Sequence, residues 1–137
     1  MRTLMLAALL GVAAGTTHHG RAEEPKDKDK PKPKASKELM RRKLELSQGL
    51  LAALTLNDLD KAGKQAADLI RLRKDPAWKV IKGETYEAFS AEFTRTAEGI
   101  TRAAKDKNLE AAKLHYLGLT LTCFNCHSYV RDRKDDA

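Results

Sequence analysis

Residues 36–54, with the sequence SKELMRRKLELSQGLLAAL, decide the fold of this chain. Apolar or small residues recur in this stretch at intervals of four and three, so they share one face of a helix. That face consists of Met40, Leu44, Ser47, Leu51 and Leu54. Ser36 precedes the stripe and is a suitable N-cap. The stretch therefore predicts an amphipathic helix whose stripe faces a core.

Three further segments show the same helical period. The second helix follows a turn in which Asn57 is the expected N-cap, and the third begins at about Thr85. The last begins at Leu109, after the N-cap Asn108, and continues to about Arg131. The expected inner faces are Leu59, Ala62, Ala66 and Leu69 in the second helix and Tyr86, Phe89, Phe93, Ala97, Ile100 and Ala104 in the third.

The chain lacks the pattern of a β-sheet, because no segment alternates apolar and polar residues between turns. Four amphipathic helices joined by short connections favour an all-α fold. We expect an antiparallel up-down-up-down four-helix bundle.

The first 22 residues have the pattern of an export signal. A short basic start at Arg2 is followed by an apolar run of 11 residues, 4–14, and Gly20-Arg21-Ala22 offers small residues for cleavage. As a helix the run would span about 16 Å, against roughly 30 Å of membrane hydrocarbon. We therefore expect an exported, periplasmic protein with no stable membrane insertion once the signal is removed. His18 and His19 would leave with it.

The charge of the chain is uneven along its length. Residues 23–37, EEPKDKDKPKPKASK, alternate charge with proline and predict a disordered tether, with a docking arm for an acidic partner or an anionic surface as the alternative. The formal net charge is +7 for the whole chain, but residues 38–137 are only mildly basic and their charges alternate in sign. The folded domain is therefore expected at 38–137, and nucleic-acid binding is not expected.

One motif carries specific chemistry. Cys123-Phe124-Asn125-Cys126-His127 is C-x-x-C-H, the attachment site of c-type haem. Two thiols three residues apart lie on the same side of a helix and can add to the two vinyl groups of one haem. The adjacent His127 is then presented to the iron as the proximal ligand. We expect one haem c, held covalently through Cys123 and Cys126.

Other interpretations of the two cysteines fit less well. A thioredoxin-like C-x-x-C requires a βαβ context, and a disulfide between residues three apart is sterically poor within a helix. A zinc or copper site needs further ligands, and only His115 is another histidine once the signal is removed. On a helix His115 points away from Cys123 and His127.

The bundle topology predicts the haem pocket. The start of the first helix, the end of the second, the start of the third and the end of the fourth share one end of such a bundle. The expected lining is Met40, Leu44, Leu69 or Ile70, Trp78, Tyr86 and Phe89. Phe93 is better explained as core, and Tyr116 is expected toward the other end of the bundle.

Residues 38–137 resemble the class II c-type cytochromes, the cytochrome c prime family. C-x-x-C-H lies near the end of a four-helix chain, and Arg131 matches the basic residue that usually follows the haem histidine there. The resemblance implies that the distal residue decides the function. Members with methionine there are six-coordinate electron carriers, and members with an apolar residue are five-coordinate and bind small gases. The arginine usual in the latter, four residues before the distal position, is absent, because Ser36 precedes Met40 at that spacing.

Met40 is the one methionine left after signal removal, and it lies on the predicted inner face near the start of the first helix, so it is the expected distal ligand. The alternative is Leu44 as the distal residue, with Met40 packing on the haem face and standing where that arginine would be. The expected function is a periplasmic electron carrier and not an enzyme. A peroxidase needs a distal base to move protons, and no histidine or pair of carboxylates is apparent on the inner face of the first helix. The alternative is a five-coordinate protein that binds NO or CO. The candidates for attracting acidic redox partners are Arg41, Arg42, Arg131, Arg133 and Lys134, with an ordinary solvated face as the favoured interpretation of each. A homodimer through the first two helices is a further expectation, with Leu46, Leu50 and Leu56 either as its interface or as a wider core face.

Overall fold

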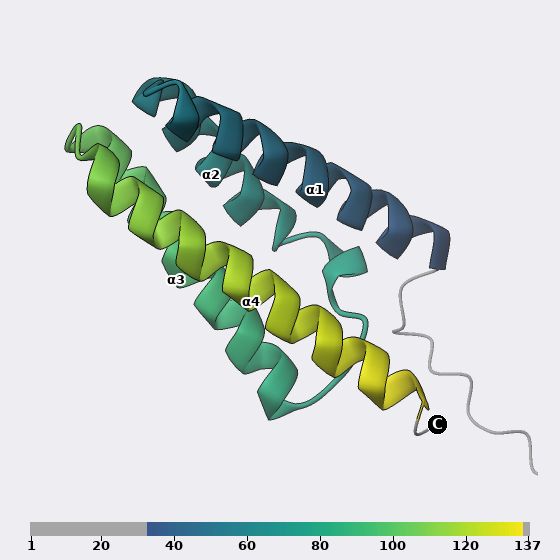
Figure 1. The fold of residues 1–137 in the computed structure, drawn as a ribbon. Coiled ribbons are helices and arrows are strands. Elements are labelled where there is room, and N and C mark those ends of the chain that lie inside the picture. Colours follow the sequence, from purple (N-terminus) through teal and green to yellow (C-terminus); the bar gives the residue numbers. More distant parts are fainter. Residues whose placement is uncertain (1–32, 136–137) are drawn as a thin grey trace, which may run out of the picture.

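The computed structural model describes residues 33–135, which form four long helices and one short 3₁₀ turn (Figure 1). The helices are α1 (Pro33–Thr55), α2 (Leu59–Leu72), α3 (Glu84–Lys105) and α4 (Leu109–Asp135), and the 3₁₀ turn η1 is Pro76–Trp78. The predicted all-α fold is confirmed, and these residues contain no strand. The expected signal segment and residues 23–32 of the expected tether lie outside the described part of the chain.

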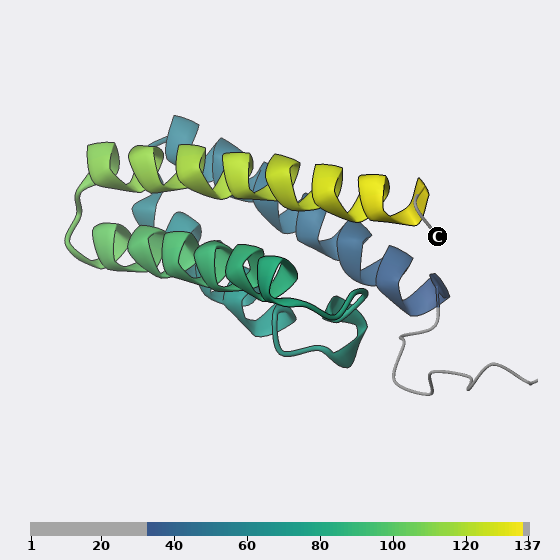
Figure 2. The same ribbon diagram turned by 90° about the horizontal axis from the view of Figure 1, so that it is seen from below.

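Each helix packs on its neighbour in the sequence, α1 on α2, α2 on α3 and α3 on α4, as expected for an up-and-down bundle. In both ribbon views the start of α1 and the end of α4 lie at the same end of the bundle (Figures 1 and 2). The segment that carries η1 and leads into α3 lies there too (Figure 2). This end therefore brings together the four regions from which the pocket was predicted.

The core is built from the predicted inner faces of α2 and α3. Leu59, Ala62, Ala66 and Leu69 are buried on α2, and Tyr86, Phe93, Ala97, Ile100 and Ala104 are buried on α3. Phe89 is half-buried. Burying a large apolar side chain contributes about 1.5–3 kcal/mol. Phe93, Leu50, Leu69, Ile100 and Leu119 are the largest apolar side chains that are fully enclosed.

The predicted inner face of α1 is partly wrong. Leu44 and Leu51 are 58% and 51% exposed, whereas the buried residues of α1 are Leu39, Lys43, Leu50, Ala53 and Leu54. The physical reason is that α1 has two apolar rows. The core row, with Leu39 and Leu50, packs on α2 and η1, and the groove row, with Met40 and Leu44, faces α4 across an open groove. Leu50 is fully buried and Leu46 packs against the core, so both belong to a wider core face.

The helix ends differ in detail from the prediction. Asp58, and not Asn57, is the N-cap of α2, and its carboxylate accepts a hydrogen bond from the Lys61 backbone N–H at 2.9 Å. Asn57 instead adopts a left-handed conformation with φ 57°. The predicted cap at the start of α4 is confirmed, because Asn108 Oδ1 accepts from the Ala111 N–H at 3.0 Å. No helix within residues 33–135 is long and apolar enough to cross a membrane.

Helix α1 begins at Pro33, three residues before the expected cap. Proline is tolerated in the first turn of a helix because the amide hydrogen that it lacks has no helical partner there. Ser36 then lies within the helix, and its hydroxyl donates to the carbonyl oxygen of Ala77 at 3.3 Å. This contact ties the first turns of α1 to η1.

Candidate functional site

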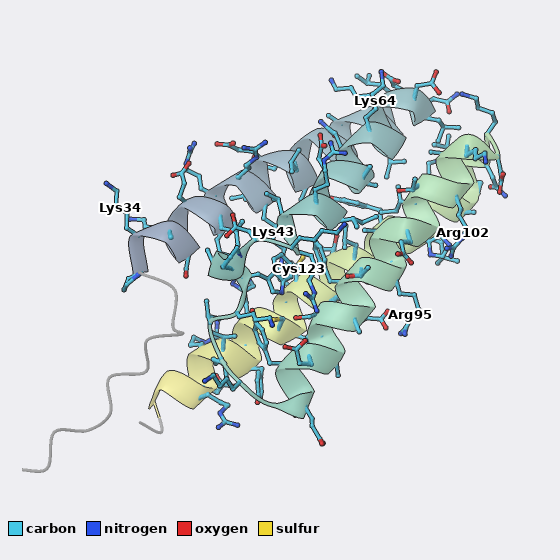
Figure 3. All side chains as sticks on the ribbon, turned by 180° about the vertical axis from the view of Figure 1, so that it is seen from behind. Lys34, Lys43, Lys64, Arg95, Arg102 and Cys123 are labelled. Atoms are coloured by element: carbon cyan, nitrogen blue, oxygen red, sulfur yellow. The ribbon has the colours of Figure 1, made fainter. Side chains whose placement is uncertain are left out.

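The two cysteines and His127 lie on α4, where they line cavities together with residues of α1. Figure 3 shows Cys123 in the middle of the molecule. Residues three and four apart on a helix are neighbours on its surface, so Cys123 lies beside Cys126 and His127. Both thiols are free and half-buried, while the His127 side chain is exposed. The helix therefore presents two thiols and an imidazole together.

Two adjoining cavities lie between α1 and α4. The first, of about 440 Å³, extends to η1 and the start of α3, and the second, of about 830 Å³, follows the α1–α4 groove. Both volumes are in the range of ligand pockets. Four residues line both cavities, namely Lys37, Met40 and Lys43 from α1 and His127 from α4. Met40 and His127 therefore approach the same space from opposite walls.

Trp78 forms a fixed wall of the smaller cavity. Its indole Nε1–H donates to the Ser90 hydroxyl at 3.0 Å, and its ring packs on Phe93 with centroids 4.9 Å apart. The Tyr86 hydroxyl donates to the Trp78 carbonyl oxygen. Burial raises the pKa of Tyr86 to about 12. Contacts to both the ring and the backbone carbonyl fix Trp78 in place, so this wall of the cavity is rigid.

Lys43 is a buried cation at the centre of the site. Its side chain is only 7% exposed, and its Nζ lies 4.5 Å from the centroid of Trp78 and 4.4 Å from that of Phe93. Burial lowers the pKa of Lys43, and negative charge on Cys123 and Cys126 would oppose that shift. Lys43 and Cys123 both line the larger cavity, and Figure 3 labels both in the middle of the molecule.

The titratable groups of α4 differ in what their pKa shifts favour. The loss of surrounding water lowers the pKa of His127, and repulsion from Lys43 and Arg131 lowers it further. The ring is therefore neutral at physiological pH, and neutral imidazole is the form that binds metals. Burial raises the pKa of the Cys126 thiol. Cys126 is therefore kept in its protonated form.

Some of the other residues predicted for the pocket line a cavity and others do not. Trp78 and Tyr86 line the smaller cavity, and Leu44 lines the larger. Phe89 lines neither, because it packs on Tyr129 with ring centroids 5.8 Å apart. Arg131 also lines neither; it is exposed and donates to the Ser128 hydroxyl at 3.2 Å.

The second helix contributes nothing to the lining. Leu69 belongs to the core, and Ile70 packs against that core. Neither residue lines either cavity.

Sequence reasoning missed two residues of the site. Lys43 could have been found, because it interrupts an apolar row of α1 that runs through Leu39, Leu46 and Leu50 at helical spacing. Tyr116 was expected at the other end of the bundle, but it lines the larger cavity and its hydroxyl donates to the Ser47 carbonyl oxygen at 3.2 Å. The groove is longer than the predicted pocket, and no sequence signal indicates that length.

The residues present fit a flat, apolar, iron-containing cofactor. The groove offers two thiols for covalent attachment, an imidazole beside them and a thioether on the facing wall. Its walls carry Leu44, Leu51, Leu119 and Phe124. Within residues 33–135, no three His, Cys, Asp or Glu side chains form a group that could hold a metal ion by themselves. Comparison of the chain with family models, with curated proteins and with solved structures finds no match.

Proposed function

We propose that this protein is an exported monohaem c-type cytochrome that carries electrons, similar to the six-coordinate class II cytochromes c. The observation that carries the proposal is the pair of facing donors, because Met40 from α1 and His127 from α4 line the same two cavities beside Cys123 and Cys126. The cysteines hold the haem, His127 is the proximal ligand and Met40 the distal one.

When bound, the haem supplies a one-electron iron couple. The residues of the chain set the properties of that couple. A methionine thioether is a soft ligand that favours the reduced iron, so Met40 raises the reduction potential. The apolar walls exclude water, and the rigid Trp78 wall limits rearrangement of the site. With both donors in place no open position for a substrate is left, which supports electron transfer over catalysis.

The mouth of the groove is basic. Lys34, Lys37 and Arg41 line the larger cavity, and the only carboxylate in that lining, Glu38, is paired with Arg41 at 2.6 Å. This surplus of positive charge supports an acidic redox partner. The rate of electron exchange with such a partner should fall as the salt concentration rises, because salt screens exposed charges over about 10 Å at 0.1 M. A rate independent of salt would contradict an acidic partner.

A five-coordinate protein that binds NO or CO is the second candidate, because Leu44 lines the larger cavity one helical turn after Met40. The absorption spectrum of the haem-loaded protein separates the two. A low-spin reduced spectrum that changes little with CO, together with a sulfur-to-iron band in the oxidised protein, supports Met40 ligation. A high-spin spectrum that shifts strongly with CO supports gas binding. Absence of attached haem after expression with the cytochrome c maturation machinery would contradict both.

A further inference from the structure

Lys43 has a charge but no partner of opposite charge. Its side chain is buried, and none of the ion pairs within residues 33–135 involves it. The aromatic rings of Trp78 and Phe93 contact its Nζ, but an aromatic face offers a cation only about 0.5–2 kcal/mol. A buried charge is costly unless it is paired. A lysine in this position is stabilised either by losing its proton or by pairing with an anion.

The protein itself offers Lys43 no lasting anion in the site. The smaller cavity has no Asp or Glu in its lining, and the larger has only Glu38, which is bonded to Arg41. The Cys123 and Cys126 thiols are the nearby groups whose negative charge would favour the lysine cation. Attachment of haem would turn both thiols into thioethers, which cannot ionise. For a charged Lys43 in the haem-loaded protein, the cofactor is then the source of an anion within the site.

We propose that the ammonium group of Lys43 pairs with a carboxylate of the attached haem, so that one haem propionate is held inside the bundle and not in solvent. This inference rests on the proposed function. The propionates are the only anionic groups of a haem, and Lys43 lines both cavities beside Met40 and His127. Lys34 and Lys37 also line the groove, but both are exposed and water satisfies their charge.

The pairing would make the charge of Lys43 affect the reduction potential of the iron. A positive charge close to the haem favours the reduced state, and a paired propionate stays ionised and takes up no proton on reduction. In Lys43→Met the propionate becomes an uncompensated buried anion that favours the oxidised iron and gains a proton when the iron is reduced.

The experiment is a redox titration of the haem-loaded protein between about pH 5 and pH 8, the range over which a buried, unpaired carboxyl group titrates. Lys43→Met should lower the equilibrium constant for reduction at least tenfold, equal to ~59 mV for a one-electron couple. Its potential should also rise as the pH falls, while the potential of the unaltered protein stays nearly constant. Lys43→Arg keeps the charge and should restore most of the potential.

The matched control is Lys64→Met, which removes the same charge from an exposed residue of α2 at the far end of the bundle (Figure 3). A potential in Lys43→Met equal to that in Lys64→Met, or lower but independent of pH, would overturn the pairing. Because the thioether introduced in Lys43→Met could itself bind iron, Lys43→Leu is measured beside it. A change of axial ligand in the electron paramagnetic resonance spectra of both variants would overturn the pairing, because Lys43 would then bind iron.

The unaltered protein supplies a second test that does not depend on the variant folding. With the haem propionates labelled with ¹³C at the carboxyl carbon, one carboxylate should titrate well below the usual range of about 4 and the other within it. Two ordinary titrations would overturn the pairing. Because all these measurements start from attached haem, a negative result rejects the role of Lys43 alone, whereas failure of attachment rejects the proposed function.

Discussion

Replacing Met40 with alanine tests the axial ligand with little effect on the fold. Met40 is half-buried and packs at the edge of the core. A fully buried methionine costs about 2–5 kcal/mol on truncation to alanine, so a half-buried one should cost about half of that. This loss is small against the 5–15 kcal/mol that stabilises an ordinary domain. Met40→Ala should therefore stay folded and keep its haem.

The variant should lose the distal thioether. The expected result is conversion of a six-coordinate low-spin haem to a five-coordinate high-spin one that binds CO, together with loss of the sulfur-to-iron band. Leu44→Ala is the matched control, because it also removes an apolar side chain from the groove wall of α1, and its spectrum should be unchanged. An unchanged spectrum in Met40→Ala would refute the ligand assignment. A conversion to high spin in Leu44→Ala as complete as that in Met40→Ala would refute it too, because leucine offers iron no donor atom and the change would then not report loss of the thioether.

Three further predictions concern the wall and the attachment site. The pKa of Tyr86 is raised to about 12, above its usual value of about 10. Its contribution to the free energy of unfolding is therefore full below about pH 10 and is lost as the pH rises toward 12. Tyr86→Phe should flatten the pH dependence of urea unfolding in that window. Ser90→Ala leaves the Trp78 indole N–H without its partner and should lower the free energy of unfolding by about 1–3 kcal/mol, whereas Ser128→Ala, at a surface contact, should change it by less than about 0.5 kcal/mol. Cys126→Ser should leave one thioether link, which mass spectrometry and the absorption maximum of the alkaline pyridine complex both detect; a haem still held by two links would contradict the attachment site.

The helical period predicted where the helices lie in the chain, and α2 and α3 each bury the one apolar face that it indicated. The inner faces of α2 and α3 followed directly, since Leu69, Phe93 and Ile100 have no other surface to cover. Helix α1 was harder, because it carries two apolar rows at helical spacing. The sequence alone does not decide which row faces the core, since that depends on where η1 and α4 lie.

Part of the site could be predicted from the spacing of residues in the sequence, and part depended on tertiary packing. The relative placement of Cys123, Cys126 and His127 is a local property of one helix, so the motif predicted it. The cavities depend on how far α1 and α4 stand apart, which no local pattern encodes. Lys43 illustrates the difference, because its charge suggests a surface position while its place in an apolar row suggests burial.

The two rows of α1 give the helix two separate roles. The row with Leu39, Leu50 and Leu54 holds α1 on the bundle, and the row with Met40 and Leu44 faces α4 across the groove. A helix with all its apolar residues buried in the core could not also line an apolar cofactor site. Lys43 belongs to the core row by its burial and to the groove row by the cavities that it lines. A charge at that boundary connects the stability of the bundle to the chemistry of the groove, so loss of the anion that pairs with Lys43 should also loosen α1.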